Sequence, residues 1–263
     1  MKKAVFFANL KIYFRSRQDL QNYLDVFKKN LTGVTLDILE VHLMADFLSF
    51  EFIKKSLENF GLKVGVQDIF WEDSGAYTGE VSPSMLASLG CDSAFLGHFE
   101  RRTLFGENDE NLNRKLLACL RNGLTPFYFI GEGKDEHAGN LTEKVLANQL
   151  RAGLKGIDVK NIREIVFIYE PIWVIGQKAS PSVDLIRTVY FMIKDIISDI
   201  YGNDPEAGRA RILYGGSIVD LKSLKDIMSI KELDGVGIAR AAVDPLSLID
   251  FIKATGESVK NRL

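Results

Sequence analysis

The chain has 263 residues, of which 46% are hydrophobic and 26% are charged, and its formal net charge is −2 at pH 7. This length suits a single α/β barrel, and the composition is that of a globular chain and not of a disordered one. The near-neutral charge argues against a general nucleic-acid binder or a protein of anionic membrane surfaces. An anionic substrate would therefore have to be bound by local positive groups.

Neither the cysteines nor the N-terminal segment indicates export. Cys91 and Cys119 lie in apolar stretches without a metal-ligand partner at motif spacing, so we expect two buried thiols in a reducing compartment. The apolar run at residues 4–8 is too short for a signal-peptide core, and no stretch approaches the ~18–20 apolar residues of a membrane span. The sequence predicts a cytoplasmic protein without a membrane partner.

Short apolar runs alternate with longer amphipathic runs along the whole chain. The apolar runs are rich in Val, Ile, Phe and Tyr and lack a clean polar alternation, which is typical of strands covered on both faces. In chain order, the predicted strands are residues 5–9, 36–41, 63–67, 93–97, 126–130, 165–169, 211–214 and 235–239.

Amphipathic segments with helical spacing lie between these strands, and the clearest are residues 16–29, 111–121 and 181–200. Pro181 suits the first turn of the longest, and Gly61, Gly90 and Gly123 stand where C-terminal glycine caps belong. Eight strand–helix alternations without a linker favour a closed barrel over an open doubly wound sheet. We therefore expect an α/β fold, a (β/α)8 barrel of eight parallel strands, with residues 1–263 as one domain.

In such a barrel, functional residues gather at the C-terminal ends of the strands. The predicted strand ends carry cations, an imidazole, carboxylates and a glycine-rich turn, all on one face of the barrel. The residues are Asn9, Lys11, His98, Glu100, Glu170, Gly215, Gly216, Ser217, Ala239 and Arg240.

This set has the parts needed to move a carbonyl between adjacent carbons. Glu170 can act as the base that removes a proton next to the carbonyl, and His98 with Lys11 can stabilise the enediolate oxygens. The glycine-rich turn exposes N–H groups suited to a phosphate. Each residue alone has an ordinary structural explanation, so the prediction rests on their joint placement. His42 and His137 do not stand with other candidate catalytic residues at a strand end, and we expect them to be non-catalytic.

Four segments resemble the triosephosphate isomerase family, and the resemblance runs over essentially the whole chain. One is similar to the dimer-interface loop of that family, one to its catalytic-histidine motif, one to its catalytic base and lid, and one to its phosphate-binding turn. In chain order they are residues 75–80 (GAYTGE), 97–102 (GHFERR), 169–176 (YEPIWVIG) and 214–217 (YGGS).

The resemblance implies a role for each residue of the catalytic set. Glu170 would be the base and His98 a neutral electrophile, as in the established chemistry of this family. Lys11 would neutralise the substrate, Asn9 would orient it, and Glu100 would lie close to Lys11.

The resemblance also implies a phosphate site, a dimer, and no cofactor or metal. Thr78 would reach into a neighbouring subunit and brace its active site, which makes a homodimer the expected assembly. The phosphate of a small sugar would be held by Gly176, Gly215, Gly216, Ser217, Ala239 and Arg240.

The chain departs from the family pattern at four places. Phe99 replaces the usual serine beside the histidine, which leaves the resting position of the base open. Phe129 replaces a cysteine, a change that we interpret as packing. The lid reads QKAS at residues 177–180 and looks about two residues short. Ala239 and Arg240 replace two glycines, and Ala239 would limit a positive φ.

Three functions follow from these features. The first is interconversion of dihydroxyacetone phosphate and glyceraldehyde 3-phosphate through an enediolate. The alternative is a paralogous isomerase of four-carbon ketose phosphates of the erythrulose phosphate type, favoured by Arg240 and the shorter lid. The remote alternative is a non-catalytic barrel that binds a sugar phosphate, which would be expected to have lost Lys11, His98 or Glu170.

Overall fold

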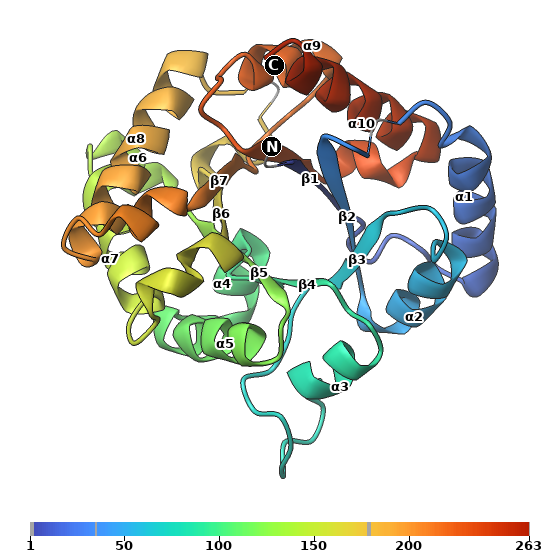
Figure 1. Cartoon of the computed structure of the whole chain (residues 1–263), viewed down its shortest axis with the longest axis horizontal. Helices are drawn as coiled ribbons and strands as arrows, with labels where there is room; N and C mark the ends of the chain where they lie inside the picture. Colours follow the sequence, from blue (N-terminus) through green and yellow to red (C-terminus); the bar gives the residue numbers. More distant parts are fainter. Residues whose placement is uncertain (1–2, 35, 178–179, 263) are drawn as a thin grey trace.

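Eight parallel strands form a closed barrel in chain order, with β8 returning to β1. The computed structural model describes residues 3–34, 36–177 and 180–262. Figure 1 shows the ring of strands surrounded by helices. The predicted (β/α)8 barrel is therefore confirmed. The strands are β1 Ala4–Asn9, β2 Leu39–Ala45, β3 Lys63–Val66, β4 Ser93–Leu96, β5 Thr125–Ile130, β6 Val166–Tyr169, β7 Arg211–Tyr214 and β8 Gly235–Ile238.

The helices of the outer ring bury one apolar face against the strands. In α8, for example, Ile186, Ile193 and Ile197 are buried. The α-helices are α1 Arg17–Asn30, α2 Phe47–Ser56, α3 Pro83–Ser88, α4 Phe99–Phe105, α5 Asp109–Arg121, α6 Lys134–Ala138, α7 Thr142–Gly153, α8 Val183–Ile200, α9 Leu221–Met228 and α10 Pro245–Lys260. Four 3-10 segments are η1 Val159–Glu164, η2 Ile172–Val174, η3 Pro205–Arg209 and η4 Arg240–Val243.

Most predicted boundaries lie close to the observed ones, and two differ for identifiable reasons. The second strand was expected at residues 36–41 but occupies Leu39–Ala45, because its polar residues Glu40 and His42 hydrogen-bond inside the barrel and do not end it. Pro181 is not in the first turn of α8. The Ser182 hydroxyl caps that helix by accepting the Leu185 N–H at 3.2 Å, so Pro181 precedes the cap.

The predicted glycine caps at the C-terminal ends of helices are confirmed, because the backbone at all three glycines is left-handed. Gly61, Gly90 and Gly123 have φ values of +69°, +77° and +69°, which residues with a side chain rarely adopt. Each allows the chain to turn from a helix toward the next strand.

The barrel interior is filled by a cluster of aromatic and aliphatic side chains, separate from the larger core between strands and helices. The Phe7 ring lies 5.2 Å from the Phe95 ring and 5.8 Å from the Phe129 ring, edge to face. A side chain at Gly237 would meet the Phe7 ring at 1.8 Å, so this strand position must be glycine. The packed rings close the interior below the functional end.

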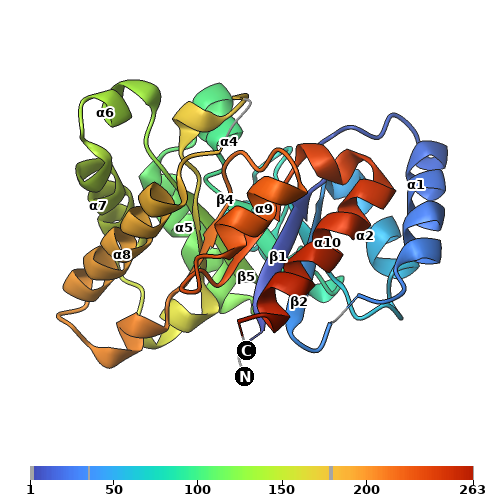
Figure 2. The ribbon, with the colours of Figure 1, turned by 90° about the horizontal axis from the view of Figure 1, so that it is seen from above.

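The two ends of the barrel differ in what they carry. In Figure 2 both chain termini lie at one end, while α4 and α6, which follow the C-terminal ends of β4 and β5, lie at the other. Among the described residues, every helix is too short or too polar to cross a membrane.

Candidate active site

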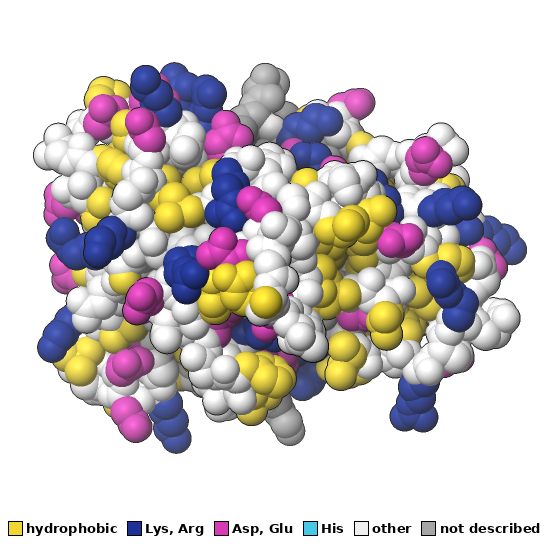
Figure 3. Space-filling view, turned by 90° about the horizontal axis from the view of Figure 1, so that it is seen from below, with side chains coloured by type: hydrophobic (Ala, Val, Ile, Leu, Met, Phe, Trp, Pro, Cys, Tyr) yellow, Lys and Arg dark blue, Asp and Glu magenta, His cyan; other side chains and the backbone are white. Residues whose placement is uncertain are grey.

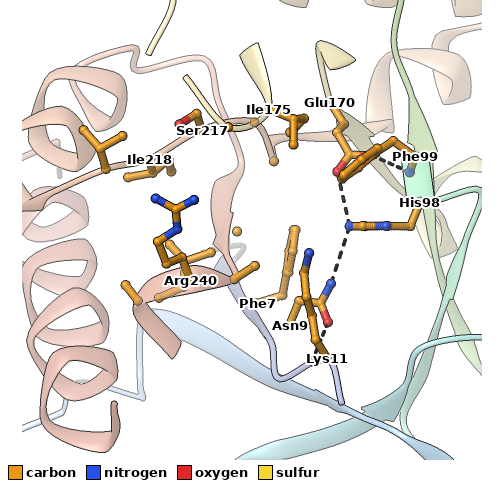
Figure 4. A pocket seen from close by; sticks show the side chains of 18 of the residues that line it. Phe7, Asn9, Lys11, His98, Phe99, Glu170, Ile175, Ser217, Ile218 and Arg240 are labelled. Carbon is orange, nitrogen blue, oxygen red and sulfur yellow. Dashed lines mark hydrogen bonds and ion pairs between the residues drawn. The ribbon is translucent and has the colours of Figure 1, made fainter. Parts of the chain in front are cut away.

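A cleft of about 380 Å³ opens at the C-terminal end of the barrel, where the sequence predicted it. Glu170, His98 and Asn9 lie in a row on one side of it, and Ser217 and Arg240 lie across from them (Figure 4). Asn9 is the last residue of β1, and the other four follow β6, β4, β7 and β8, so only the closed barrel brings them together.

Glu170 and His98 form the chemical centre of the cleft. Glu170 Oε1 lies 3.4 Å from His98 Nε2, and both residues are buried. Burial raises the pKa of Glu170 to about 8, although the Phe99 N–H and Lys11 act to lower it. Burial lowers the pKa of His98 to about 4. Both shifts have the same cause, because a dry site disfavours charge of either sign.

The ring of His98 is held in one tautomer. The N–H of Glu100 donates to His98 Nδ1 at 3.2 Å, so Nδ1 is an acceptor and the proton of the neutral ring lies on Nε2. His98 is itself the N-cap of α4, which explains this contact. Nε2–H therefore points at the space beside Glu170, where it can donate to a substrate oxygen.

The backbone of Phe99 holds the base. The Phe99 N–H donates to Glu170 Oε2 at 2.8 Å, so the resting carboxylate has a partner that does not depend on the side chain at this position. The Phe99 ring packs beside the His98 ring, with centroids 4.9 Å apart. The replacement of serine by Phe99 thus leaves the resting position of the base defined.

Lys11 has a left-handed backbone conformation that neighbouring side chains hold in place. Its φ is +49°, a conformation that costs a residue with a side chain about 1–3 kcal/mol unless its surroundings fix it. The Lys11 N–H donates to Asn9 Oδ1 at 3.0 Å, and the Gln67 amide donates to the Lys11 carbonyl at 3.0 Å. The Lys11 amine forms an ion pair with Glu100, as expected. Asn9 Nδ2 lies 3.5 Å from His98 Nε2.

The opposite side of the cleft consists of three loop ends. A side chain at Gly215 would meet Ile168 at 2.4 Å, and one at Gly216 would meet the Tyr214 hydroxyl at 2.3 Å. The Ser180 hydroxyl donates to the Ser217 carbonyl at 2.5 Å. All six residues expected at the phosphate line the cleft, namely Gly176, Gly215, Gly216, Ser217, Ala239 and Arg240.

Ala239 does not need the left-handed backbone that a glycine would supply. Its φ is −129°, and the 3-10 segment η4 begins directly after it. The expected restriction on a positive φ is therefore irrelevant here. Two residues of the lid, Lys178 and Ala179, lie outside the described residues, so the length of the lid is judged from the sequence alone.

Arg240 is exposed and lines the cleft, and it makes no hydrogen bond or ion pair with the described residues. Asp244, the acid nearest in sequence, caps α10 by accepting the Ser247 N–H at 2.7 Å. The guanidinium is therefore available on the same side as Ser217 (Figure 4).

A buried cluster behind the base was not predicted. Glu132 is fully buried after β5, and its Oε1 accepts from the Tyr169 hydroxyl at 3.0 Å and from Trp173 Nε1 at 2.8 Å. His137 stacks on Trp173, with ring centroids 3.9 Å apart. These contacts hold the segment on both sides of Glu170. The position of Glu132 after a strand end was the only signal in the sequence.

The two other histidines lie away from the chemistry, and Phe129 has a packing role beside it. His137 and His42 do not line the cleft, and His42 is buried within the barrel, hydrogen-bonded to Glu40 and Ser93. Phe129 lines the floor of the cleft as part of the aromatic packing. In the part of the chain that the structure describes, no group of three or more His, Cys, Asp or Glu could hold a metal ion.

Comparison with known proteins agrees with this geometry. A family profile described as triosephosphate isomerase matches residues 4–255. A triosephosphate isomerase of Dictyoglomus turgidum is 34% identical over 97% of this chain and 100% of its own length. The triosephosphate isomerase of Thermodesulfovibrio yellowstonii is 35% identical over 96% of this chain and 100% of its own length. That of Finegoldia magna is 37% identical over 82% of this chain and 86% of its own length. The chain belongs to the triosephosphate isomerase family.

Proposed function

We propose that this protein interconverts dihydroxyacetone phosphate and glyceraldehyde 3-phosphate. The observation that carries the proposal is the buried pair of Glu170 and His98, whose pKa values are shifted toward neutral forms by the same dry cleft. A base and a neutral hydrogen-bond donor beside one cavity are what proton transfer next to a carbonyl requires.

The reaction runs through an enediolate. Glu170 removes a proton from the carbon next to the carbonyl, and the electron pair of that C–H bond moves to form the enediolate. Nε2–H of His98 and the amine of Lys11 stabilise the charge on its oxygens. A proton also passes from the hydroxyl oxygen of the enediolate to the former carbonyl oxygen, and Nε2 of His98 is the group placed to relay it. Return of the first proton from Glu170 to the adjacent carbon then completes the isomerisation, with no net change in oxidation state.

The far side of the cleft suits the phosphate. The turn at Gly215 and Gly216 offers backbone N–H groups, and η4 begins at Arg240 with N–H groups that face no preceding helical turn. The Ser180–Ser217 hydrogen bond ties the end of the lid to this turn.

Substitution of the base tests the reaction. Glu170→Gln keeps the size of the side chain and should lower kcat by at least the ~10²–10⁴ that general-base catalysis contributes. Circular dichroism and thermal unfolding would verify that the variant is folded. Activity within tenfold of the wild type would contradict the assignment.

One observation favours a second candidate, an isomerase of four-carbon ketose phosphates. Arg240, which has no partner among the described residues, lies on the phosphate side of a cleft of about 380 Å³. Its guanidinium could bind phosphate oxygens or a hydroxyl of a longer substrate. Comparing kcat/KM for dihydroxyacetone phosphate and for erythrulose phosphates separates the two candidates.

The variant Arg240→Gly tests the role of this guanidinium. If Arg240 binds the longer substrate, the ratio of kcat/KM should move toward the three-carbon substrate, and a lost charge-assisted hydrogen bond should weaken binding by ~1.5–3 kcal/mol. The exposed Arg151 on α7 provides a control, because Arg151→Gly removes the same charge elsewhere. An unchanged ratio would remove the reason to prefer the longer substrate.

We propose further that the protein acts as a homodimer. The segment at residues 73–80, before α3, projects from the body of the barrel (Figure 1), and Thr78 is one of its exposed residues. The same side of the molecule carries patches of hydrophobic side chains (Figure 3). The exposed apolar residues of the chain include Ile12, 82% exposed, and Leu48, 91% exposed. Patches of this kind mark an interaction surface.

A second cavity supports an inserted loop from another copy. It has a volume of about 300 Å³ and is lined by Ile12, Phe47 and Phe105 together with Lys11 and Glu100. A projecting loop of a second copy placed there would exclude water from the Lys11–Glu100 ion pair. This arrangement would link dimerisation to the position of the catalytic amine.

A further inference from the structure

A third cavity lies at the end of the barrel opposite to the cleft. Its volume is about 590 Å³, and it shares no residue with the active-site cleft. Its walls come from the starts of β5 and β7 and from the ends of η1 and η3. The lining residues are Thr125, Arg163, Glu164, Arg209 and Arg211.

Arg211 is a nearly buried cation with few hydrogen bonds. Its side chain is 13% exposed. Its Nη2 donates weakly to the Glu164 carbonyl at 3.4 Å, its Nη1 lies 3.8 Å from Glu40 Oε1, and its Nε is buried without a partner among the described residues. A buried guanidinium with open donors costs free energy unless an acceptor meets it.

The acids near Arg211 are shared with other groups. Glu40 Oε1 lies 2.8 Å from His42 Nε2, and Glu40 Oε2 lies 3.2 Å from the Lys63 amine. Asp234 accepts the Ile212 N–H at 2.8 Å. Burial consequently lowers the pKa of Arg211 despite these acids. Arg211 thus lines the cavity while its Nε has no hydrogen-bond partner among the described residues.

Two further arginines flank the same space. Arg163 and Arg209 are each more than half exposed. Among the described residues, each is paired with an acid of its own segment, Glu164 at 3.5 Å and Glu206 at 3.3 Å. Three arginines against one glutamate leave the lining formally at +2. Planar guanidinium groups that line one cavity suit the oxygens of a phosphate.

We propose that this cavity is a second anion site, which binds inorganic phosphate or the phosphate group of a small metabolite. Arg211 would supply the buried donors, Arg163 and Arg209 would supply charge at the rim, and the Thr125 hydroxyl could donate from the wall. The site is independent of the proposed reaction, because its residues and those of the cleft lie at opposite ends of the barrel.

Titration with inorganic phosphate, followed by calorimetry and ³¹P NMR, tests this site. The wild type should bind two phosphates per chain, only one of which dihydroxyacetone phosphate displaces at concentrations that saturate the cleft. The double variant Arg163→Ala/Arg209→Ala should keep the displaceable phosphate and bind the other at least about tenfold more weakly. Its kcat/KM should remain that of the wild type, which separates this site from the catalytic one.

A matched control removes the same charge from another surface. Lys144→Ala/Arg151→Ala changes two exposed cations on α7 and should keep both phosphates. Glycerol 3-phosphate distinguishes the two sources: tighter binding than inorganic phosphate at the second site indicates a metabolite, and weaker binding indicates free phosphate. A single phosphate per chain in the wild type, or a second phosphate that the arginine variant binds unchanged, would overturn the proposal.

Discussion

His98 and Glu170 depend on neighbouring backbone groups for their chemical states. The Glu100 N–H fixes the imidazole tautomer, and the Phe99 N–H holds the carboxylate, so two successive amides of α4 orient both partners. Backbone donors keep their position when side chains vary. This explains how Glu170 keeps its resting position although Phe99 replaces a serine.

The raised pKa of Glu170 predicts the pH dependence of the reaction. Only the ionised carboxylate can accept a proton, and burial raises its pKa to about 8. The kcat/KM of the free enzyme should therefore still increase with pH above neutrality, well beyond the ordinary carboxyl value of 4.5. Initial rates between pH 5 and 9 would measure this. A profile that is already level above pH 5 would contradict the raised pKa.

At the scale of elements, the contact between β5 and β6 places the base. The Glu170 N–H donates to the Ile130 carbonyl at 2.8 Å, and the Ile172 N–H donates to the Glu132 carbonyl at 3.0 Å. Gly131 lies between these two anchors. A side chain on Gly131 would meet the Glu170 carbonyl oxygen at 1.9 Å, so the two strand ends can approach only through a glycine.

The substitution Gly131→Ala should therefore displace the base. A shift of about 1 Å at the reacting group costs about 10²-fold in rate, so kcat should fall at least that far, with little change in KM. Gly133→Ala is the matched control, because its added atom would meet only the flexible end of Glu136 at 3.2 Å. Equal kcat values for the two variants would show that this contact does not position Glu170.

The sequence predicted the residues whose role depends on a strand end, and it missed those whose role depends on pairing between strands. Lys11, His98 and Glu170 follow apolar runs, so the barrel rule located them. Glu132 also follows a strand, but its importance comes from the Tyr169 and Trp173 side chains that the β5–β6 pairing brings to it. No spacing within one segment records such a contact.

The end of β2 was misplaced for a similar reason. Glu40 and His42 look like the polar end of a strand, yet they lie inside the barrel where Lys63 and Ser93 supply partners from β3 and β4. Burial of polar groups is acceptable only when such partners exist. His42 and Ser93 are 51 residues apart in the chain, so a local pattern cannot reveal their contact.

At the scale of the whole molecule, the assembly is open to direct measurement. Sedimentation at assay concentrations should give a homodimer. Deleting the tip of the projecting segment, residues 76–78, should give a monomer with much lower kcat, because the Lys11–Glu100 ion pair would be exposed to water in the absence of a partner loop. A substitution at the exposed Lys144 should leave the dimer intact. A wild-type monomer with full activity would refute the proposal.

The stability of the barrel should depend on pH through its buried interior. His42 is fully buried between Glu40 and Ser93, with both contacts at 2.8 Å. A side chain at Gly65 would meet the Ser93 hydroxyl at 2.3 Å, so a glycine leaves the room for this network. Burial lowers the pKa of His42, and the contact with His42 lowers the pKa of Glu40 to about 2.

Both shifts make the folded protein less stable in acid. A group whose pKa is lower in the folded state binds more protons when unfolded, so stability is present above the unfolded pKa and is lost as the pH falls. For His42 the loss begins below about 6.5, and for Glu40 it begins below 4.5. These two groups therefore act to decrease the free energy of unfolding, measured with urea between pH 7.5 and 4, on acidification, whereas Glu170 and Asp68, whose pKa values burial raises, act in the opposite direction. His42→Gln should be less stable at pH 7.5 but should lose less between pH 7 and 5, because the amide does not titrate. His98, Glu170 and Asp68 titrate in the same way in both proteins and cancel in the comparison. Equal acid dependence in the two proteins would show that the His42 network does not control it.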